Sequence, residues 1–298
     1  MKHEALDMKP HTHDPNFKSG FVVLAGRSNV GKSTLLNALI GTKLSITTPK
    51  PQTTRFPIHG VLHDPRGQIV FVDTPGIFEH PHDPITAAVN ARARDALQGV
   101  DLILHVVDPT REIGTEERRI QTLIKNVPAP KILVINKIDE RTSFIEDFRA
   151  LAPEYAASIE IAALRHKNLK GLVELVFEYL PEGVPHYPEF QITNIANKLW
   201  FEELIREKVF LQTHAEVPYS TTVEIEEMEE RENGLLYIRA KILTTQERHK
   251  KMLIGAGARR IKEIGQAARR ELEGVTGKKI FLELEVMVDP HWPQRLAT

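Results

Sequence analysis

The sequence contains no cysteine among its 298 residues. This absence excludes disulfides, zinc–thiolate sites and thiol catalysis, and it favours a reducing compartment, with the cytoplasm as the default. The sequence also lacks any run of about eighteen apolar residues, so no transmembrane helix is expected, while peripheral contact with the inner face of a cell membrane stays open. No charge of one sign dominates, because 39 Lys and Arg nearly cancel 40 Asp and Glu. A surface for nucleic acid must therefore be local.

Residues 1–20 are polar and lack the continuous apolar stretch of a signal peptide. We expect a flexible tail. It contains His11 and His13, and two histidines in so polar a segment indicate solvated side chains rather than a metal site.

Short apolar runs alternate with helical patterns from residue 21 onward. Four runs are expected to be buried strands, at residues 21–25, 69–72, 102–107 and 132–135. This alternation predicts an α/β fold, with a mixed, mostly parallel sheet of about six strands and helices on both faces. Turn residues at 64–67 predict a hairpin, which adds one antiparallel strand.

A domain boundary is indicated at residues 180–188, where three prolines and a glycine interrupt the helical pattern. The expected division is a tail at 1–20, a nucleotide-binding domain at 21–184, a linker at 185–190 and a smaller α+β domain at 191–298. The smaller domain is expected to follow the order α, β, β, short helix, α, β. Its predicted elements are a helix carrying Ile195, Leu199, Leu204 and Val209, strands at 221–225, 235–243 and 280–288, a turn at 232–234, and a helix over 261–272.

A phosphate-binding loop is indicated between the first strand and the first helix. Phosphate binding needs several backbone N–H groups aimed at one point, a cation, and a hydroxyl for the metal. Lys32 is expected to reach the β- and γ-phosphates, and Ser33 to coordinate Mg²⁺. The residues expected to bind the nucleotide here are Gly26, Ser28, Asn29, Val30, Gly31, Lys32, Ser33 and Thr34.

Asp73 and Gly76 extend this site from the end of the strand at 69–72. A carboxylate at that strand end can hold the metal, and a mobile backbone N–H can sense the γ-phosphate. We therefore expect Asp73 at the Mg²⁺ and the Gly76 amide at the phosphate.

Residues 136–139 are expected to select the base, again at the end of an apolar strand. Guanine presents two N–H donors that a single carboxylate can accept together. Asp139 is expected to accept them, Asn136 to bind the other edge of the base, and Lys137 to pack along the phosphate-binding loop. Asp139 therefore disfavours the alternative of a P-loop kinase or ATPase.

In this order, the three motifs resemble the Era family of bacterial GTPases, and the resemblance extends from about Phe21 to Trp292. It implies that residues 50–55 form the first switch, where Thr54 completes the Mg²⁺ shell when GTP is bound. It also implies a backbone N–H beside the guanine, supplied by Ala163 in the stretch 161–163.

Hydrolysis needs charge neutralisation and a group that positions the attacking water. Lys32 and Mg²⁺ supply the first, but Ile77 stands where Ras-like enzymes carry a glutamine, so slow intrinsic turnover is expected. The resemblance implies a compensation, because Asn29 matches a P-loop asparagine of potassium-activated members. Our hypothesis is that K⁺, or an RNA or ribosome partner, accelerates hydrolysis. The expected catalytic residues are Lys32, Asn29, Thr54 and Gly76.

Charge is polarised in the second domain, with ten Lys or Arg against four Glu over residues 246–279. The resemblance implies a type II KH domain, which holds about four nucleotides of single-stranded RNA at a Gly-x-x-Gly loop. The matching loop is Gly255 to Ala258, so its fourth position departs from the pattern. Ala258 is harmless at negative φ, but a left-handed turn there costs on the order of 1 kcal/mol. The residues expected at RNA are Lys250, Lys251, Gly255, Ala256, Gly257, Ala258, Arg259, Arg260 and Lys262.

The resemblance as a whole implies a GTP/GDP switch that binds small-subunit ribosomal RNA near its 3′ end and acts in assembly of the 30S subunit. From the residues alone, two alternatives stay open. One is an RNA-binding scaffold whose nucleotide site is structural, favoured by Ile77, and the other is the P-loop ATPase or kinase. Within the second domain, the alternative to RNA binding is a basic helix that is merely solvated.

Overall fold

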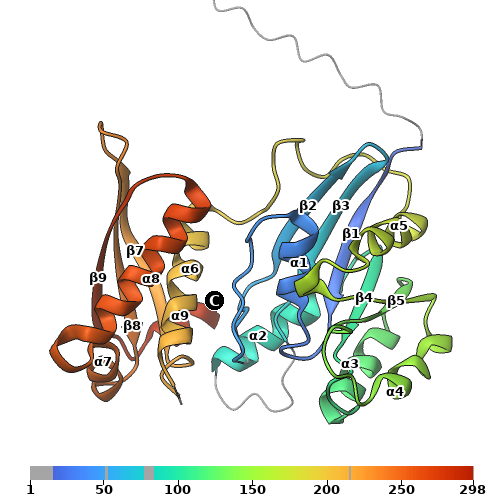
Figure 1. The fold of residues 1–298 in the computed structure, drawn as a ribbon, viewed down its shortest axis with the longest axis horizontal. Coiled ribbons are helices and arrows are strands. Elements are labelled where there is room, and N and C mark those ends of the chain that lie inside the picture. The colour runs from blue at the N-terminus through green and yellow to red at the C-terminus, as the bar shows by residue number, and fades with distance from the viewer. Residues whose placement is uncertain (1–15, 51–52, 77–83, 215, 298) are drawn as a thin grey trace, which may run out of the picture.

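Two domains lie side by side in the computed structural model, which describes residues 16–50, 53–76, 84–214 and 216–297 (Figure 1). The larger domain is built on a six-stranded sheet and the smaller one on a three-stranded sheet. His11, His13 and Ile77 lie outside the described residues.

The larger sheet has the strand order β2-β3-β1-β4-β5-β6. Every neighbouring pair is parallel except β2 and β3, which form the expected antiparallel hairpin. The strands are β1 (Lys18–Ala25), β2 (Ile58–Asp64), β3 (Gly67–Asp73), β4 (Leu102–Val107), β5 (Lys131–Ile135) and β6 (Ala157–Glu160). The predicted mixed sheet is therefore confirmed.

Helices cover both faces of this sheet. They are α1 (Lys32–Ile40), α2 (Pro84–Asp95), α3 (Thr115–Lys125), α4 (Ile145–Arg149) and α5 (Leu169–Tyr179). Apolar residues of α1 and α5 pack in one core cluster, and those of α3 pack in another on the opposite face. Because the parallel strands share one direction, their carboxyl ends meet at one edge, where the motif residues after β1, β3 and β5 come together.

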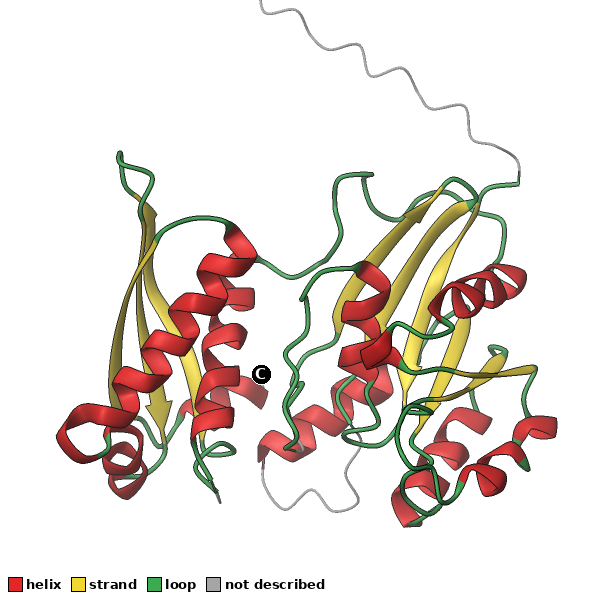
Figure 2. Cartoon of the chain, in the orientation of Figure 1, coloured by secondary structure: helices red, strands yellow, loops and turns green. Residues whose placement is uncertain are grey.

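The smaller domain shows the predicted order of elements. They are α6 (Asn197–Gln212), β7 (Thr221–Glu230), β8 (Leu236–Thr244), α7 (Glu247–Ile254), α8 (Arg259–Thr276), β9 (Ile280–Val288) and a last helix, α9 (Trp292–Ala297). Strand β8 pairs antiparallel with β7 and parallel with β9. Figure 2 shows α6 and α8 on the side of the small sheet that faces the larger domain. Over the part of the chain that is described, no helix is long and apolar enough to span a bilayer.

Two expected boundaries are wrong. Strand β1 begins at Lys18, so Lys18, Ser19 and Gly20 belong to the sheet rather than to the tail. These residues pair with the first residues of β3, and this pairing does not require an apolar pattern. Helix α6 begins at Asn197, and Ile195 packs against the core of the larger domain instead. The other domain boundaries stay predictions.

The segment between the domains is attached to the larger sheet. The side-chain oxygen of Gln68 accepts the backbone N–H groups of His186 and Tyr187, at 2.7 and 2.9 Å. The N–H of Val61 donates to the carbonyl of Ile192 at 2.8 Å. The connecting chain therefore covers β2, which is the edge strand of the sheet.

Candidate functional site

The phosphate-binding loop lies between the end of β1 and the start of α1. Its backbone has positive φ at Gly26 (159°), Asn29 (64°) and Gly31 (100°). Glycine adopts such angles without a steric cost, and asparagine tolerates the left-handed region better than most residues. Gly31 caps α1, so the first N–H groups of this helix open toward the loop.

Lys32 is buried at the centre of the loop. Its ammonium donates to the carbonyls of Gly26 and Arg27, at 2.7 and 2.9 Å. Burial lowers the pKa of Lys32 to about 8, and the carboxylate of Asp73 opposes this shift. Since few groups solvate this cation, an incoming phosphate would be a favourable partner.

Hydroxyls converge on the carboxylate of Asp73 at the mouth of the loop. Oδ2 of Asp73 accepts from Ser33 Oγ at 2.6 Å and from Ser45 Oγ at 2.7 Å. Thr54 Oγ1 lies 3.1 Å from Ser33 Oγ. Asp73 Oδ1 is buried and has no hydrogen-bond partner among the described residues, and burial raises the pKa of this carboxyl. A carboxylate with an unpartnered oxygen, flanked by hydroxyls, fits a hard cation such as Mg²⁺.

Asn136 ties the phosphate-binding loop to the loop after β6. Its Nδ2 donates to the carbonyl of Val30 at 2.9 Å, and its Oδ1 accepts the N–H of Ala163 at 3.0 Å. Lys137 has a left-handed backbone, with φ 60°, and donates to Asp108 at 2.6 Å. The structure thus brings the predicted residues Val30, Asn136 and Ala163 together, and it adds Asp108.

Asp139 faces an arginine that the sequence analysis did not single out. Its Oδ2 lies 3.5 Å from Nε of Arg165, which is itself largely exposed. The Asp139 side chain keeps 22% of its surface exposed, so a ligand can reach the carboxylate.

A cavity of about 300 Å³ joins the phosphate-binding loop to the first switch. Its lining includes nine predicted residues, namely Ser28, Asn29, Gly31, Lys32, Ser33, Thr34, Thr54, Gly76 and Lys137. Arg111 and residues 46–49 also line it and were not expected, and Thr53 and Thr74 complete the lining. Asn29 Nδ2 donates to the carbonyl of Pro49 at 2.8 Å, which draws the switch over the loop. Pro51 and Gln52 of the expected switch lie outside the described residues.

The Gly-x-x-Gly-like loop of the smaller domain joins α7 to α8. Gly255, Gly257 and Ala258 all have positive φ, at 72°, 58° and 59°. Ala258, with ψ 23°, is therefore left-handed, which is the less favourable of the two conformations considered for it. Beyond the loop, Arg259 is exposed and pairs with Glu263 at 3.3 Å.

A second cavity, of about 280 Å³, follows this loop between α8 and β9. It is lined by Ile261, Lys262, Gly265, Gln266, Arg269, Leu282 and Leu284. Only Lys262 was expected to bind a ligand. The others have the spacing of one helix face and of alternate strand positions, a pattern that also describes ordinary core residues, so the sequence alone could not identify them.

Comparison with known proteins agrees with these features. Residues 21–137 match the family described as 50S ribosome-binding GTPase, and residues 216–293 match the KH domain. The GTPase Era of Halothermothrix orenii is 43% identical over 283 residues, covering 94% of this chain and 96% of that protein. The GTPase Era of Trichlorobacter lovleyi is 44% identical over 290 residues, covering 95% and 97%.

Two solved structures are similar to this chain along most of its length. One is Era in complex with MgGDPNP and nucleotides 1506–1542 of 16S ribosomal RNA, at 40% identity and a TM-score of 0.88, covering 94% of this chain and 96% of the other. The second is a single-residue variant of Aquifex aeolicus Era bound to GDP·AlF4⁻, at 39% identity, with the same TM-score and coverage. This chain belongs to the Era family of GTPases.

Proposed function

We propose that the chain is a GTP-hydrolysing switch that binds single-stranded small-subunit ribosomal RNA near its 3′ end and acts in small-subunit assembly in the cytoplasm. The observation that carries this proposal is the convergence of Ser33, Thr54 and Asp73 at the phosphate-binding loop. Contact with the inner face of the membrane stays a prediction.

In the proposed GTP complex, Lys32 leaves its two loop carbonyls and binds the β- and γ-phosphates. Ser33, Thr54 and Asp73 hold Mg²⁺, which neutralises charge on the phosphate oxygens when it is bound. The buried, unpartnered Oδ1 of Asp73 supports this assignment. Gly76 lies against the backbone of Ser28, where its amide can meet the γ-phosphate.

Guanine recognition is assigned to Asp139, Asn136, Lys137 and the N–H of Ala163. Asn136 already fixes the Ala163 loop, so the base meets a preformed site. Each hydrogen bond from guanine to the Asp139 carboxylate contributes roughly 1.5 to 3 kcal/mol. Arg165 competes with guanine for Oδ2 of this carboxylate, which lies 3.5 Å from its Nε.

Water activation is the part of hydrolysis that the described residues do not supply. We therefore keep the hypothesis that K⁺ or a ribosomal partner accelerates the reaction. The K⁺ version rests on Asn29, whose side-chain oxygen is a suitable ligand for this cation while its Nδ2 donates to the carbonyl of Pro49. Equal hydrolysis rates in Na⁺ and K⁺ buffers, with no effect of Asn29→Asp, would remove the potassium hypothesis.

RNA binding is assigned to the loop from Gly255 to Ala258 and to the adjacent cavity. The loop amides approach the RNA backbone, and Arg259, Arg260, Lys250, Lys251 and Lys262 supply charge for the phosphates. Ile261, Leu282 and Leu284 offer an apolar floor on which a base can lie. The Era relative solved with a 16S fragment supports the choice of RNA.

One experiment tests both which RNA the protein binds and whether this binding depends on the nucleotide. The protein is crosslinked to RNA in cells, and the recovered RNA is sequenced, with Asp139→Asn as the control for nucleotide dependence. Enrichment of the 3′ end of small-subunit RNA is expected. Recovery without ribosomal RNA would remove the assembly role, while equal competition by ATP and GTP in a binding assay would favour the ATPase or kinase alternative.

A further inference from the structure

The first switch of the larger domain packs on helix α6 of the smaller one. Residues 41–50 and 53–57 contain no helix or strand, so their conformation depends on tertiary contacts. Ile46 in this segment is fully buried, and it belongs to the apolar core of the smaller domain rather than to that of its own. The KH domain therefore anchors the chain that leads into the switch at residues 50–55.

Polar contacts hold the same segment at its two ends. Glu207 of α6 is buried, and its carboxylate accepts the N–H of Thr47 at 2.8 Å and the ammonium of Lys43 at 2.7 Å. Lys50 donates to the carbonyls of Phe210 and Thr213 at the end of α6. A cation at a helix C-terminus is favourable, because the last carbonyls of a helix lack intrahelical partners.

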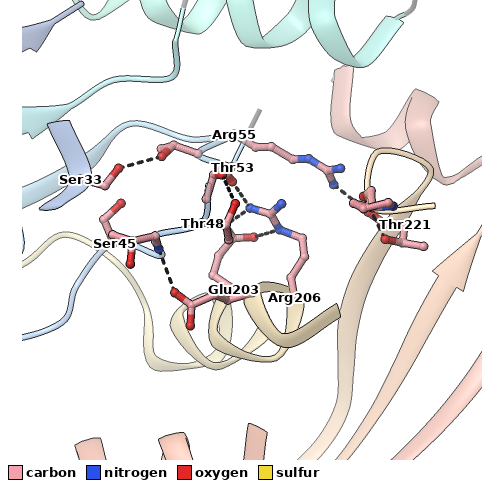
Figure 3. A network of polar contacts seen from close by, with 12 residues as sticks. Ser33, Ser45, Thr48, Thr53, Arg55, Glu203, Arg206 and Thr221 are labelled. Carbon is pink, nitrogen blue, oxygen red and sulfur yellow. Dashed lines mark hydrogen bonds and ion pairs between the residues drawn. The ribbon is translucent and has the colours of Figure 1, made fainter. Parts of the chain in front are cut away.

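Arg206 contacts the residue directly before Thr54 of the nucleotide site. Its guanidinium is almost fully buried and is held by Glu203, with nitrogen–oxygen distances of 2.7 and 2.5 Å. The same guanidinium donates to the backbone carbonyl of Thr53 (Figure 3). Thr53 is directly followed by Thr54, whose hydroxyl lies 3.1 Å from Ser33.

We propose that Arg206 is a positioning residue for GTP hydrolysis. By fixing the carbonyl of Thr53, Arg206 sets the hydroxyl of Thr54 at the cation site between Ser33 and Asp73. Helix α6 thus shapes a switch that belongs to another domain. Because this irregular segment is already held in place, it loses less conformational entropy when it reaches the geometry needed for hydrolysis. The inference rests on the proposed GTPase function of this site.

The test compares Arg206→Gln with Arg239→Gln in the full-length protein. Arg239 controls for the loss of an arginine that pairs with carboxylates of the smaller domain, because it pairs with Glu226 and Glu227, is half exposed and lies on β8 away from the switch. GTP hydrolysis is measured across a Mg²⁺ titration, and GDP affinity is measured beside it.

We expect Arg206→Gln to lower kcat about 10-fold and to raise the Mg²⁺ concentration for half-maximal rate about 10-fold, which corresponds to one lost charge-assisted hydrogen bond. GDP affinity should stay unchanged, because Thr54 is expected at the cation only with GTP. A loss of stability at the domain interface alone would affect the GTP-bound and the GDP-bound protein alike. Arg206→Lys should recover part of the rate, and Arg239→Gln should match the wild type.

Arg206 is buried, so its loss leaves Glu203 without a partner and can unfold the protein. Lys50→Gln therefore serves as a second variant, because it loosens the same segment from the side of the larger domain. A wild-type Mg²⁺ dependence in both Arg206→Gln and Lys50→Gln overturns the inference and leaves the GTPase intact. A wild-type protein that does not hydrolyse GTP at all would instead overturn the proposed function.

Discussion

Replacing Ala258 by glycine should stabilise the smaller domain. Ala258 stands at φ 59° and ψ 23°, directly before α8. A left-handed backbone costs an L-residue about 1–2 kcal/mol. Glycine avoids this cost, but its freer unfolded chain offsets about 0.5–1 kcal/mol of the gain. Glycine is also a better residue than alanine at the start of a helix. We expect a net gain of about 1 kcal/mol in the free energy of unfolding.

Urea denaturation followed by tryptophan fluorescence measures this gain. Both tryptophans of the chain, Trp200 and Trp292, lie in the smaller domain, so the signal reports on that domain. Ala256→Gly is the matched control, because Ala256 stands in the same loop without a positive φ, and glycine there should be neutral or destabilising. If the two substitutions change the midpoint alike, the left-handed strain at Ala258 does not exist.

RNA affinity gives the functional side of the same prediction. Removing the Cβ of Ala258 lets the loop amides approach a phosphate more closely, so the dissociation constant for single-stranded RNA should fall. The assignment of this loop fails if Ala258→Gly leaves affinity unchanged while Arg259→Glu also has no effect.

Three further predictions concern the nucleotide site and the RNA cavity. The pKa of Lys32 is about 8 in the free protein, and a bound phosphate favours the charged form of this side chain. GDP affinity should therefore fall about 10-fold from pH 7 to pH 9. Guanosine, which lacks phosphates, is the control. Asp73→Asn should lower Mg²⁺-dependent hydrolysis about 100-fold, yet raise Tm, because the buried carboxylate resists ionisation. Arg269→Glu should weaken RNA binding and reduce its salt dependence, as filter binding at two salt concentrations would show, while leaving GTP hydrolysis without RNA unchanged.

The nucleotide site was largely predictable from the sequence because its residues occupy fixed positions after strands. A strand end places Asp73 or Asn136 at a known edge of a parallel sheet, and the glycines of the loop reflect a backbone requirement. Ser45 escaped notice because it lies in an irregular segment, where a serine carries no periodic signal. Its contact with Asp73 depends on how residues 41–50 fold back. Hydrogen bonds from Leu44 and Ser45 to Asn37 of α1, and the packing of Ile46 in the smaller domain, hold that path.

Contacts between the domains could not be predicted for a similar reason. Arg206 and Glu203 follow the spacing of a salt bridge on an exposed helix, and nothing local distinguishes them from a surface pair. Ala258 shows another limit, because the residue type alone allowed both signs of φ and only the path of the loop selected one. The start of β1 at Lys18 was missed because polar residues can continue the backbone pairing of a sheet once a partner strand is present, and this leaves no apolar pattern in the sequence.

The connecting chain that runs along β2 limits how far the two domains can move relative to each other. Asn194 accepts the N–H of His59 at 2.9 Å, Ile195 packs on the core of the larger domain, and α6 begins at Asn197, so the pivot between the domains shrinks to Ala196. A pivot this short permits rotation but little translation. If the contacts between α6 and residues 43–53 open, any RNA held by the smaller domain would move on an arc of fixed radius about the edge of the larger sheet, rather than within the wide volume that a flexible tether would give it.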